Sequence, residues 1–179
     1  VTSINLSGTV DSDPTRTGAA SDYSAVWRFW DPVVFPTTPW PETVGGMDGY
    51  FNTYRKFAEI TDGASNTMVV TESSGRPEYW AKGKKQTGLI PSNPFYSSAW
   101  VGARGIPVQS FDETGLVPHG TCIVNCANTN GGIYSFHAGG ANSVFADGSV
   151  HFLREGTNKL VIYALASSKF GEVIDSTDY

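Results

Sequence analysis

The sequence has few charged residues and few of the residue types that most often carry chemistry. Only 16% of its 179 residues are Asp, Glu, Lys or Arg, and it holds two cysteines and three histidines. With 17 acidic against 12 basic residues the net charge is −5, which argues against a nucleic-acid partner because phosphates require a basic surface. The one basic cluster, formed by Lys82, Lys84 and Lys85, is interpreted as a short solvated loop.

Long apolar runs and enzyme motifs are also missing. No run approaches the ~20 apolar residues that cross a bilayer, so the chain as given is not expected to span a membrane. The sequence contains no Gly-x-Ser-x-Gly elbow, phosphate loop, dinucleotide fingerprint or His-Glu-x-x-His. We therefore expect no catalytic residues and no enzyme activity.

Glycine, proline and aromatic residues are plentiful instead. The 20 glycines, 10 prolines and 13% aromatic residues are typical of a loop-rich β protein with an uncharged polar surface, as extracellular proteins often have. A chain of this length suits one domain. We expect a single globular domain over residues 1–179, with residues 1–20 as an extended arm or linker.

The clearest pattern lies between residues 133 and 153. Two β-prone runs, 142–146 and 149–153, flank Asp147 and Gly148, a dipeptide that favours a two-residue type I′ turn. Such a turn pairs Phe145 with Val150. It would place Phe145, Val150 and Phe152 on one face of the hairpin and Val144, His151 and Leu153 on the other.

A third β-prone run, 133–136, precedes this hairpin and is joined to it through His137, Gly139 and Gly140. Paired glycines supply backbone angles that other residues adopt only at a cost, so the connection is tight and shaped. The three runs predict a three-stranded antiparallel meander. His137 precedes the central strand and Asp147 follows it, so we expect them roughly 17–20 Å apart, each stabilising its own turn.

The remaining chain predicts further elements around this meander. Residues 23–30 and 67–73 are expected to be strands, and Glu72 is interpreted as a strand-end carboxylate facing water, with an Arg or metal contact as the alternative. Residues 31–49 contain four prolines and are expected to be irregular. Weaker predictions are a helix or strand over 50–60, short strands at 78–81, 98–102 and 172–174, and a fraying tail at 175–179.

A helix is predicted after residue 157. Thr157 or Asn158 caps it, Gly171 stops it, and the expected apolar stripe consists of Leu160, Val161, Ala164 and Leu165. Together with the meander and the long loops, this helix predicts an α+β fold.

The two cysteines, Cys122 and Cys126, are spaced for a disulfide, and their even number fits an oxidising compartment. A zinc site is the alternative, because His119 and His137 lie close to them in sequence, although the spacing matches no known zinc module. Free thiols are the third reading. The sequence favours the disulfide.

Tryptophans in the proline-rich region admit two interpretations. Trp27, Trp30 and Trp40, with Trp80 and Trp100 later in the chain, either cover the second face of the sheet or stack on sugar rings in exposed loops.

The stretch from His137 through nine residues to Asp147-Gly148 resembles the C-terminal signature of a planctomycete family catalogued as domain of unknown function 1559. The stretches 60–67, 122–126 and 165–173 resemble the same family, in the same order. The motif positions are His137, Gly139, Gly140, Asn142, Asp147 and Gly148, with Asp62, Gly63 and Asn66 in the first stretch, where Asp62 is interpreted as a turn-former.

The resemblance implies a pilin-like head, because members typically carry a prepilin-type N-terminal helix. That helix does not occur in this sequence, so we interpret the chain as a head lacking its stalk or as a processed or divergent member. The implied function is a non-catalytic extracellular or cell-surface subunit that assembles with copies of itself or with other pilin-like subunits. A surface glycan-binding module is the alternative.

No cofactor is expected. The likeness to pseudopilins leaves calcium open, with Asp175 and Asp178 as candidate ligands, although these residues are better explained as part of an acidic tail.

Overall fold

The computed structural model describes residues 4–5, 17–18, 21–29, 31–34, 48–49, 53–54, 56–76, 78–87, 105–129 and 131–169, and four single positions near the C-terminus. These positions are Gly171, Ile174, Thr177 and Tyr179. The predicted strand at 98–102 and most of the loop at 31–49 lie outside the described residues.

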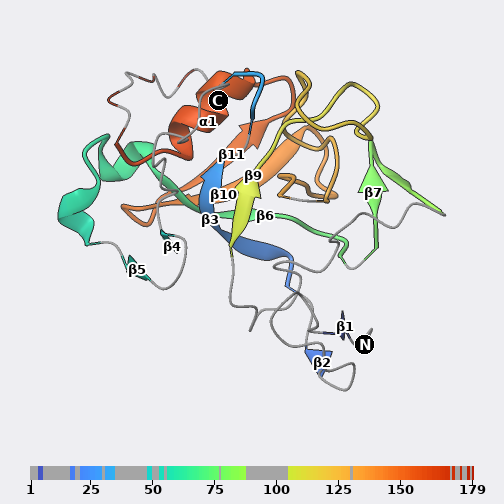
Figure 1. The fold of residues 1–179 in the computed structure, drawn as a ribbon, viewed down its shortest axis with the longest axis horizontal. Coiled ribbons are helices and arrows are strands. Elements are labelled where there is room, and N and C mark those ends of the chain that lie inside the picture. The colour runs from blue at the N-terminus through green and yellow to red at the C-terminus, as the bar shows by residue number, and fades with distance from the viewer. Residues whose placement is uncertain are drawn as a thin grey trace.

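A five-stranded sheet forms the centre, in the order β11-β10-β6-β3-β9 (Figure 1). Neighbouring strands are antiparallel from β11 to β3, whereas β9 joins β3 in parallel at the far edge. The α+β prediction is confirmed. The bounds are β3 Tyr23–Phe29, β6 Met68–Glu72, β9 Ile106–Val108, β10 Gly140–Phe145 and β11 Val150–Arg154.

The predicted three-stranded meander is wrong, because the second neighbour of β10 is β6 and not the run 133–136. Ile133 and Tyr134 form only isolated parallel bridges, to Val124 and Ser73. The connection between the run 133–136 and β10 is held by hydrogen bonds from side chains and not by pairing between strands. The Ser135 hydroxyl donates to the Gly140 carbonyl at 2.6 Å, which leaves the inner edge of β10 free for β6.

The predicted two-residue turn is also wrong. Val144 lies opposite Val150, and the Gly148 N–H donates to the Phe145 carbonyl at 2.9 Å, so the loop has the three residues 146–148. Gly148 has a φ of 86°, which places a left-handed residue at the end of the loop as three-residue hairpins require.

Because the loop is one residue longer than predicted, the side chains of β11 that share a face with Phe145 differ from the predicted ones. Phe145, His151 and Leu153 share the inner face, and the rings of Phe145 and His151 lie 4.6 Å apart. The outer face carries Val144, Val150 and Phe152.

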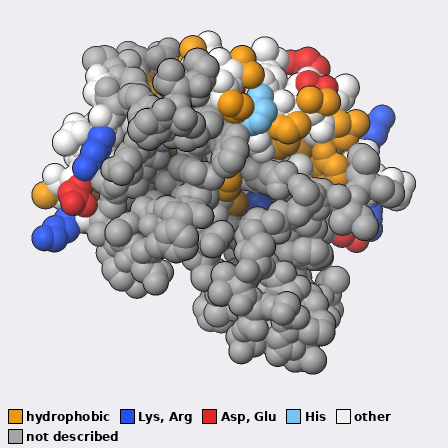
Figure 2. Space-filling view, viewed as in Figure 1, with side chains coloured by type: hydrophobic (Ala, Val, Ile, Leu, Met, Phe, Trp, Pro, Cys, Tyr) orange, Lys and Arg blue, Asp and Glu red, His pale blue; other side chains and the backbone are white. Residues whose placement is uncertain are grey.

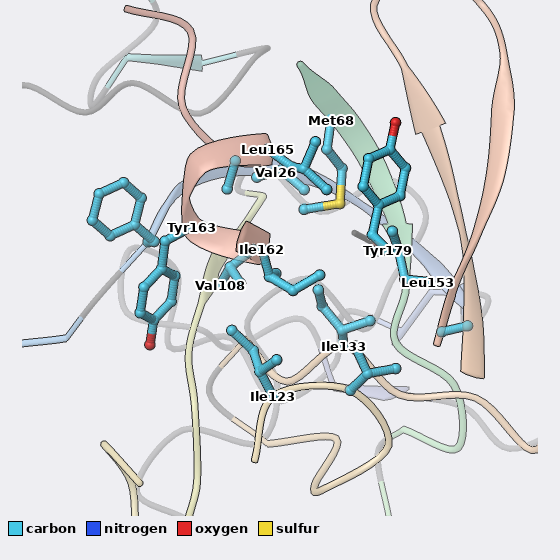
Figure 3. Packing of buried hydrophobic residues seen from close by; sticks show 14 of the residues in the cluster. Val26, Met68, Val108, Ile123, Ile133, Leu153, Ile162, Tyr163, Leu165 and Tyr179 are labelled. Atoms are coloured by element: carbon cyan, nitrogen blue, oxygen red, sulfur yellow. The ribbon is translucent and has the colours of Figure 1, made fainter. Parts of the chain in front are cut away.

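Helix α1, Lys159–Leu165, covers the inner face of the sheet (Figures 1 and 3). Of the two predicted caps, Thr157 and Asn158, the structure shows Asn158, which accepts a hydrogen bond from the Leu160 N–H at 2.9 Å. The predicted apolar stripe is confirmed at Leu165 and Val161, which pack in or against the core, and is wrong at Leu160, which is 51% exposed. The residues that face the sheet are Ile162, Tyr163, Leu165 and Ala166.

The core lies between α1 and the sheet, where the labelled side chains of Figure 3 converge from segments far apart in the sequence. Met68 and Val26 come from the sheet, and Ile123 and Ile133 from the loops below it. Tyr179 also packs here, 8% exposed and stacked 5.8 Å from Phe145, so the prediction that the tail frays is wrong at this residue. Ile174 is half-buried and lies outside any strand.

The smaller elements surround this sheet. Within the predicted N-terminal arm, β1 (Ile4–Asn5) pairs with β2 (Thr17–Gly18). The other small elements are β4 Asp48–Gly49, β5 Thr53–Tyr54, β7 Trp80–Ala81 and β8 Lys84–Lys85, with the short helices η1 Phe57–Glu59 and η2 Ala64–Asn66. Among the described residues, no helix is long and apolar enough to cross a membrane.

Candidate functional site

The connection that carries His137 is organised by one buried side chain, Asn125. Its amide nitrogen donates to the carbonyls of His137 and Gly140 at 3.3 and 3.2 Å, and to the Glu155 carboxylate at 2.8 Å. Its amide oxygen accepts from the Ser135 N–H at 2.8 Å. Asn125 has a φ of 56°, a conformation that asparagine tolerates better than most residues. The backbone of His137 is therefore held in place by Asn125, which leaves the imidazole available for another contact.

That contact is Glu72, the last residue of β6. The imidazole Nε2 of His137 lies 3.4 Å from Oε1 of Glu72, and the Asn142 N–H donates to Oε2 at 2.6 Å. The Glu72 side chain is only 5% exposed, whereas that of His137 is 60% exposed. The interpretation of Glu72 as a carboxylate facing water is wrong, because its side chain is buried and accepts a backbone hydrogen bond from strand β10.

Tyr23 completes this polar group from β3. It lies opposite Glu72 in the sheet, and its pKa is raised, first by burial and then by the charge and hydrogen bonding of Glu72. Tyr23, Glu72, Asn142 and His137 together are called the Glu72 site below. The sequence motif had pointed to His137 and Asn142, but nothing in the sequence linked them to Glu72 or Tyr23.

Partly exposed aromatic rings lie in and beside the Glu72 site. Tyr23 is 45% exposed, Phe152 42% and Phe136 59%. Phe152 lies opposite Asn142 in the sheet, and Phe136 meets the ring of Trp80 edge-on with centroids 5.0 Å apart. Figure 2 shows one face of the molecule, on which hydrophobic side chains gather around a histidine. A buried carboxylate among partly exposed rings is suited to binding a ligand or partner that has both polar and apolar groups.

Asp147 lies at the other end of β10 and does not join the Glu72 site. Its carboxylate accepts hydrogen bonds from the N–H and hydroxyl of Ser149 at 2.9 and 2.6 Å. These bonds, with the Ser149 hydroxyl as the largest contributor, lower the pKa of Asp147. As predicted, Asp147 stabilises its own turn and stays apart from His137.

Asp62 does more than form a turn. Its two carboxylate oxygens accept from the Gly171 N–H at 2.7 Å and the Ser167 hydroxyl at 3.2 Å, which ties the stretch 60–67 to the stretch after α1. Gly63, with a φ of 94°, and Asn66 complete the local turn through the hydrogen bond from the Asn66 N–H to the Gly63 carbonyl at 3.0 Å. Two stretches that resemble the family thus contact each other.

Sequence reasoning missed a second buried polar group, centred on Asp31. The Asp31 carboxylate is fully buried and accepts from Lys159 Nζ at 2.8 Å and from the Tyr163 hydroxyl at 3.0 Å. Burial by itself raises the pKa of Asp31, but the hydrogen bonds from Lys159 and Tyr163 outweigh it and the pKa is lowered. The only sequence signal was a charged residue directly after a predicted strand.

Cys122 and Cys126 form a disulfide, as predicted, with Cα atoms 5.9 Å apart. The zinc alternative is therefore excluded for these sulfurs in the oxidised protein. Among the described residues, no group of three or more His, Cys, Asp or Glu side chains is arranged to hold a metal ion. The calcium candidates Asp175 and Asp178 lie outside the described residues.

Most of the tryptophans proposed for glycan binding cannot be placed. The backbone of Trp27 belongs to β3, but its side chain lies outside the described part of the chain, as do Trp30, Trp40 and Trp100. Trp80 is half-buried beside Phe136.

Comparison with known proteins adds a family but no activity. Neither curated proteins nor solved structures gave a match. A family described as "Protein of unknown function (DUF1559)" matches residues 5–160, which is most of the chain and includes the stretches around Asp62, Cys122 and His137. The chain therefore belongs to the DUF1559 family.

Proposed function

We propose that this protein is a non-catalytic subunit of an extracellular or cell-surface assembly, resembling the head of a pilin or pseudopilin. Its partners are copies of itself or other pilin-like subunits. The polar residues of the family stretches support a structural role. Asp62, Asn125 and Asp147 each bind backbone groups of their own chain. The disulfide supports an oxidising location outside the cytoplasm.

The observation that carries the proposal is the outer surface of strand β11. This strand lies at the edge of the sheet, with Val150 63% and Phe152 42% exposed. The Phe145 N–H donates to the Ser149 carbonyl at one end of the β10–β11 pair, and the Glu155 N–H donates to the Gly139 carbonyl at the other end. The odd-numbered residues of β11 therefore form their backbone hydrogen bonds with β10. The backbone groups of Val150 and Phe152 then point away from β10, beside two exposed apolar side chains. An edge of this kind favours pairing with another chain.

The test uses the purified protein over a range of concentrations. Electron microscopy and light scattering of the purified protein are expected to show filaments or oligomers, and Val150→Lys is expected to abolish them. Val33→Lys is the matched control, because Val33 is 70% exposed in a turn outside the sheet. A wild-type protein that stays monomeric at all concentrations would contradict the proposal. So would Val150→Lys and Val33→Lys variants that reduce assembly equally.

Glycan binding is the second candidate, favoured by the rings around the Glu72 site. Stacking of sugar faces on Phe136 or Tyr23, with polar contacts to His137, is the expected mode. A glycan array, followed by tryptophan fluorescence titration of the best sugar, tests it. Phe136→Ala should weaken binding at least tenfold, whereas Phe57→Ala, which removes a ring that is 73% exposed in η1, should leave it unchanged. Absence of any binding sugar removes this candidate.

A further inference from the structure

The two sulfurs of the disulfide differ in their exposure. Cys126 is fully buried, and its Sγ lies 3.3 Å from the Val124 carbonyl. Cys122 is only partly buried. An external thiolate therefore reaches the sulfur of Cys122 more easily than that of Cys126.

A lysine stands at the accessible sulfur. The Nζ of Lys82 lies 2.8 Å from Sγ of Cys122. The backbone fixes this approach, because the Lys82 N–H donates to the Cys126 carbonyl at 2.9 Å and Ala81 forms a bridge with Ala127. Lys82 itself adopts a φ of 48° at the turn between β7 and β8. The turn is thus docked on the disulfide loop, and the ammonium group is directed to Cys122.

A positive charge at a cysteine sulfur has two effects. It attracts an incoming thiolate, and it stabilises the cysteine thiolate that reduction produces. Both effects act on Cys122.

A carboxylate also lies in the neighbouring loop. Glu113 accepts a hydrogen bond from the Thr121 hydroxyl at 2.7 Å.

We propose that Cys122 and Cys126 form a thiol–disulfide exchange site, in which Cys122 is the sulfur that is attacked, Cys126 the sulfur that leaves and Lys82 the residue that stabilises the Cys122 thiolate. The co-reactant is a small thiol. This activity is independent of the proposed assembly function, since it requires neither β11 nor the Glu72 site.

The exchange proceeds in two steps. A thiolate attacks Sγ of Cys122; a new S–S bond forms, the bond to Cys126 breaks, and its electron pair remains on Cys126, which takes up a proton. A second thiolate attacks the external sulfur of this mixed disulfide and releases Cys122 as a thiolate beside Lys82. Two electrons pass from two thiols, which leave as their own disulfide, to the protein.

The experiment compares the wild-type protein with Lys82→Gln, Lys82→Arg and Lys84→Gln. Lys84 is an exposed lysine of the same hairpin and serves as the matched control. The initial rate of reaction of the oxidised, folded protein with glutathione is measured at pH 7, and the first glutathione adduct is located by peptide mass spectrometry. The fraction reduced is then measured in glutathione buffers of graded ratio.

The first adduct is expected on Cys122. Lys82→Gln is expected to slow the first attack by about three- to tenfold, and to shift the equilibrium against the reduced form by a similar factor. Effects of this size are expected when one partly solvated charge is removed. Lys82→Arg and Lys84→Gln are expected to stay within about twofold of wild type, because the charge at the sulfur is kept.

Two results would overturn the proposal. The first is a glutathione adduct that forms first on Cys126. The second is a Lys82→Gln variant whose initial rate equals that of the wild type or of Lys84→Gln. The initial rate is measured on the oxidised protein, so this comparison holds whether or not the reduced form keeps its fold.

Discussion

Replacing Lys159 with methionine should destabilise the protein strongly, because it leaves a buried carboxylate without its cation. Asp31 is fully buried, and the Lys159 side chain, 16% exposed, lies 2.8 Å from it. Methionine keeps most of the volume of lysine and removes the charge. The backbone donors Val33 and Val34 and the hydroxyl of Tyr163 would remain around the carboxylate.

The expected loss follows from the burial of the pair. Removing one partner of a buried ion pair costs about 3–5 kcal/mol, and we expect about 3 kcal/mol because the remaining donors still hold Asp31. For a domain of this size, that corresponds to a drop of roughly 6–12 °C in melting temperature.

The loss should depend on pH with a defined sign. In the wild type the pKa of Asp31 is lowered, so its contribution to stability is present above the unfolded value of about 4 and is lost as the pH falls through the folded pKa. Without Lys159, burial dominates and raises this pKa. The difference in unfolding free energy between wild type and variant should therefore be largest near pH 7 and shrink toward pH 4.

Urea unfolding at pH 7, 5.5 and 4, followed by circular dichroism, measures this difference. Lys169→Met is the control, since Lys169 is exposed, and should change the unfolding free energy by less than about 0.5 kcal/mol. A loss below about 1 kcal/mol for Lys159→Met, or a loss that does not change with pH, would refute the assignment of a buried ion pair.

Three further substitutions, one of them with a matched control, test the packing around the sheet. Gly140→Ala should lower the free energy of unfolding by about 2–3 kcal/mol, because the added Cβ would lie 2.1 Å from the Leu153 carbonyl oxygen. Its control, Gly139→Ala, meets open space but has a φ of 86°, and should lower the free energy by about 1 kcal/mol. Equal losses in urea unfolding would count against the close approach at Gly140. Asn125→Ala should cost about 3 kcal/mol, since three of its hydrogen bonds serve backbone groups, and hydrogen exchange of the 135–140 amides should accelerate. Tyr179→Ala should lower stability by about 3 kcal/mol, and an unchanged melting temperature would show that the tail does not pack in the core.

The sequence predicted the features that depend on neighbouring residues. Strand β6, a helix cap at residue 157 or 158 and the role of Asp147 in its own turn all follow from patterns within about five residues, and the structure confirms them. The disulfide also belongs to this group, because four residues of separation allow the two cysteines little choice of partner.

The candidate sites were harder to predict, because their members come from distant segments. Glu72 and His137 are 65 positions apart, and nothing in either stretch points to the other. Asp31 and Lys159 likewise meet only because β3 ends beneath α1. Charge and spacing along the chain carry no information about such pairs until the strand order is known.

The amino-acid sequence by itself determined several local features: where strands β3, β6, β10 and β11 form, where glycine allows a turn, that a capped helix follows residue 157, and which family the chain resembles. The tertiary structure decided which strand lies beside β10 and which face each side chain occupies. The physical reason is that a pleated strand alternates its faces at every residue, so a loop of three residues instead of two moves an entire strand's side chains relative to their partners. That choice is made by packing against β6 and α1, and these contacts cannot be derived from the hairpin's own residues.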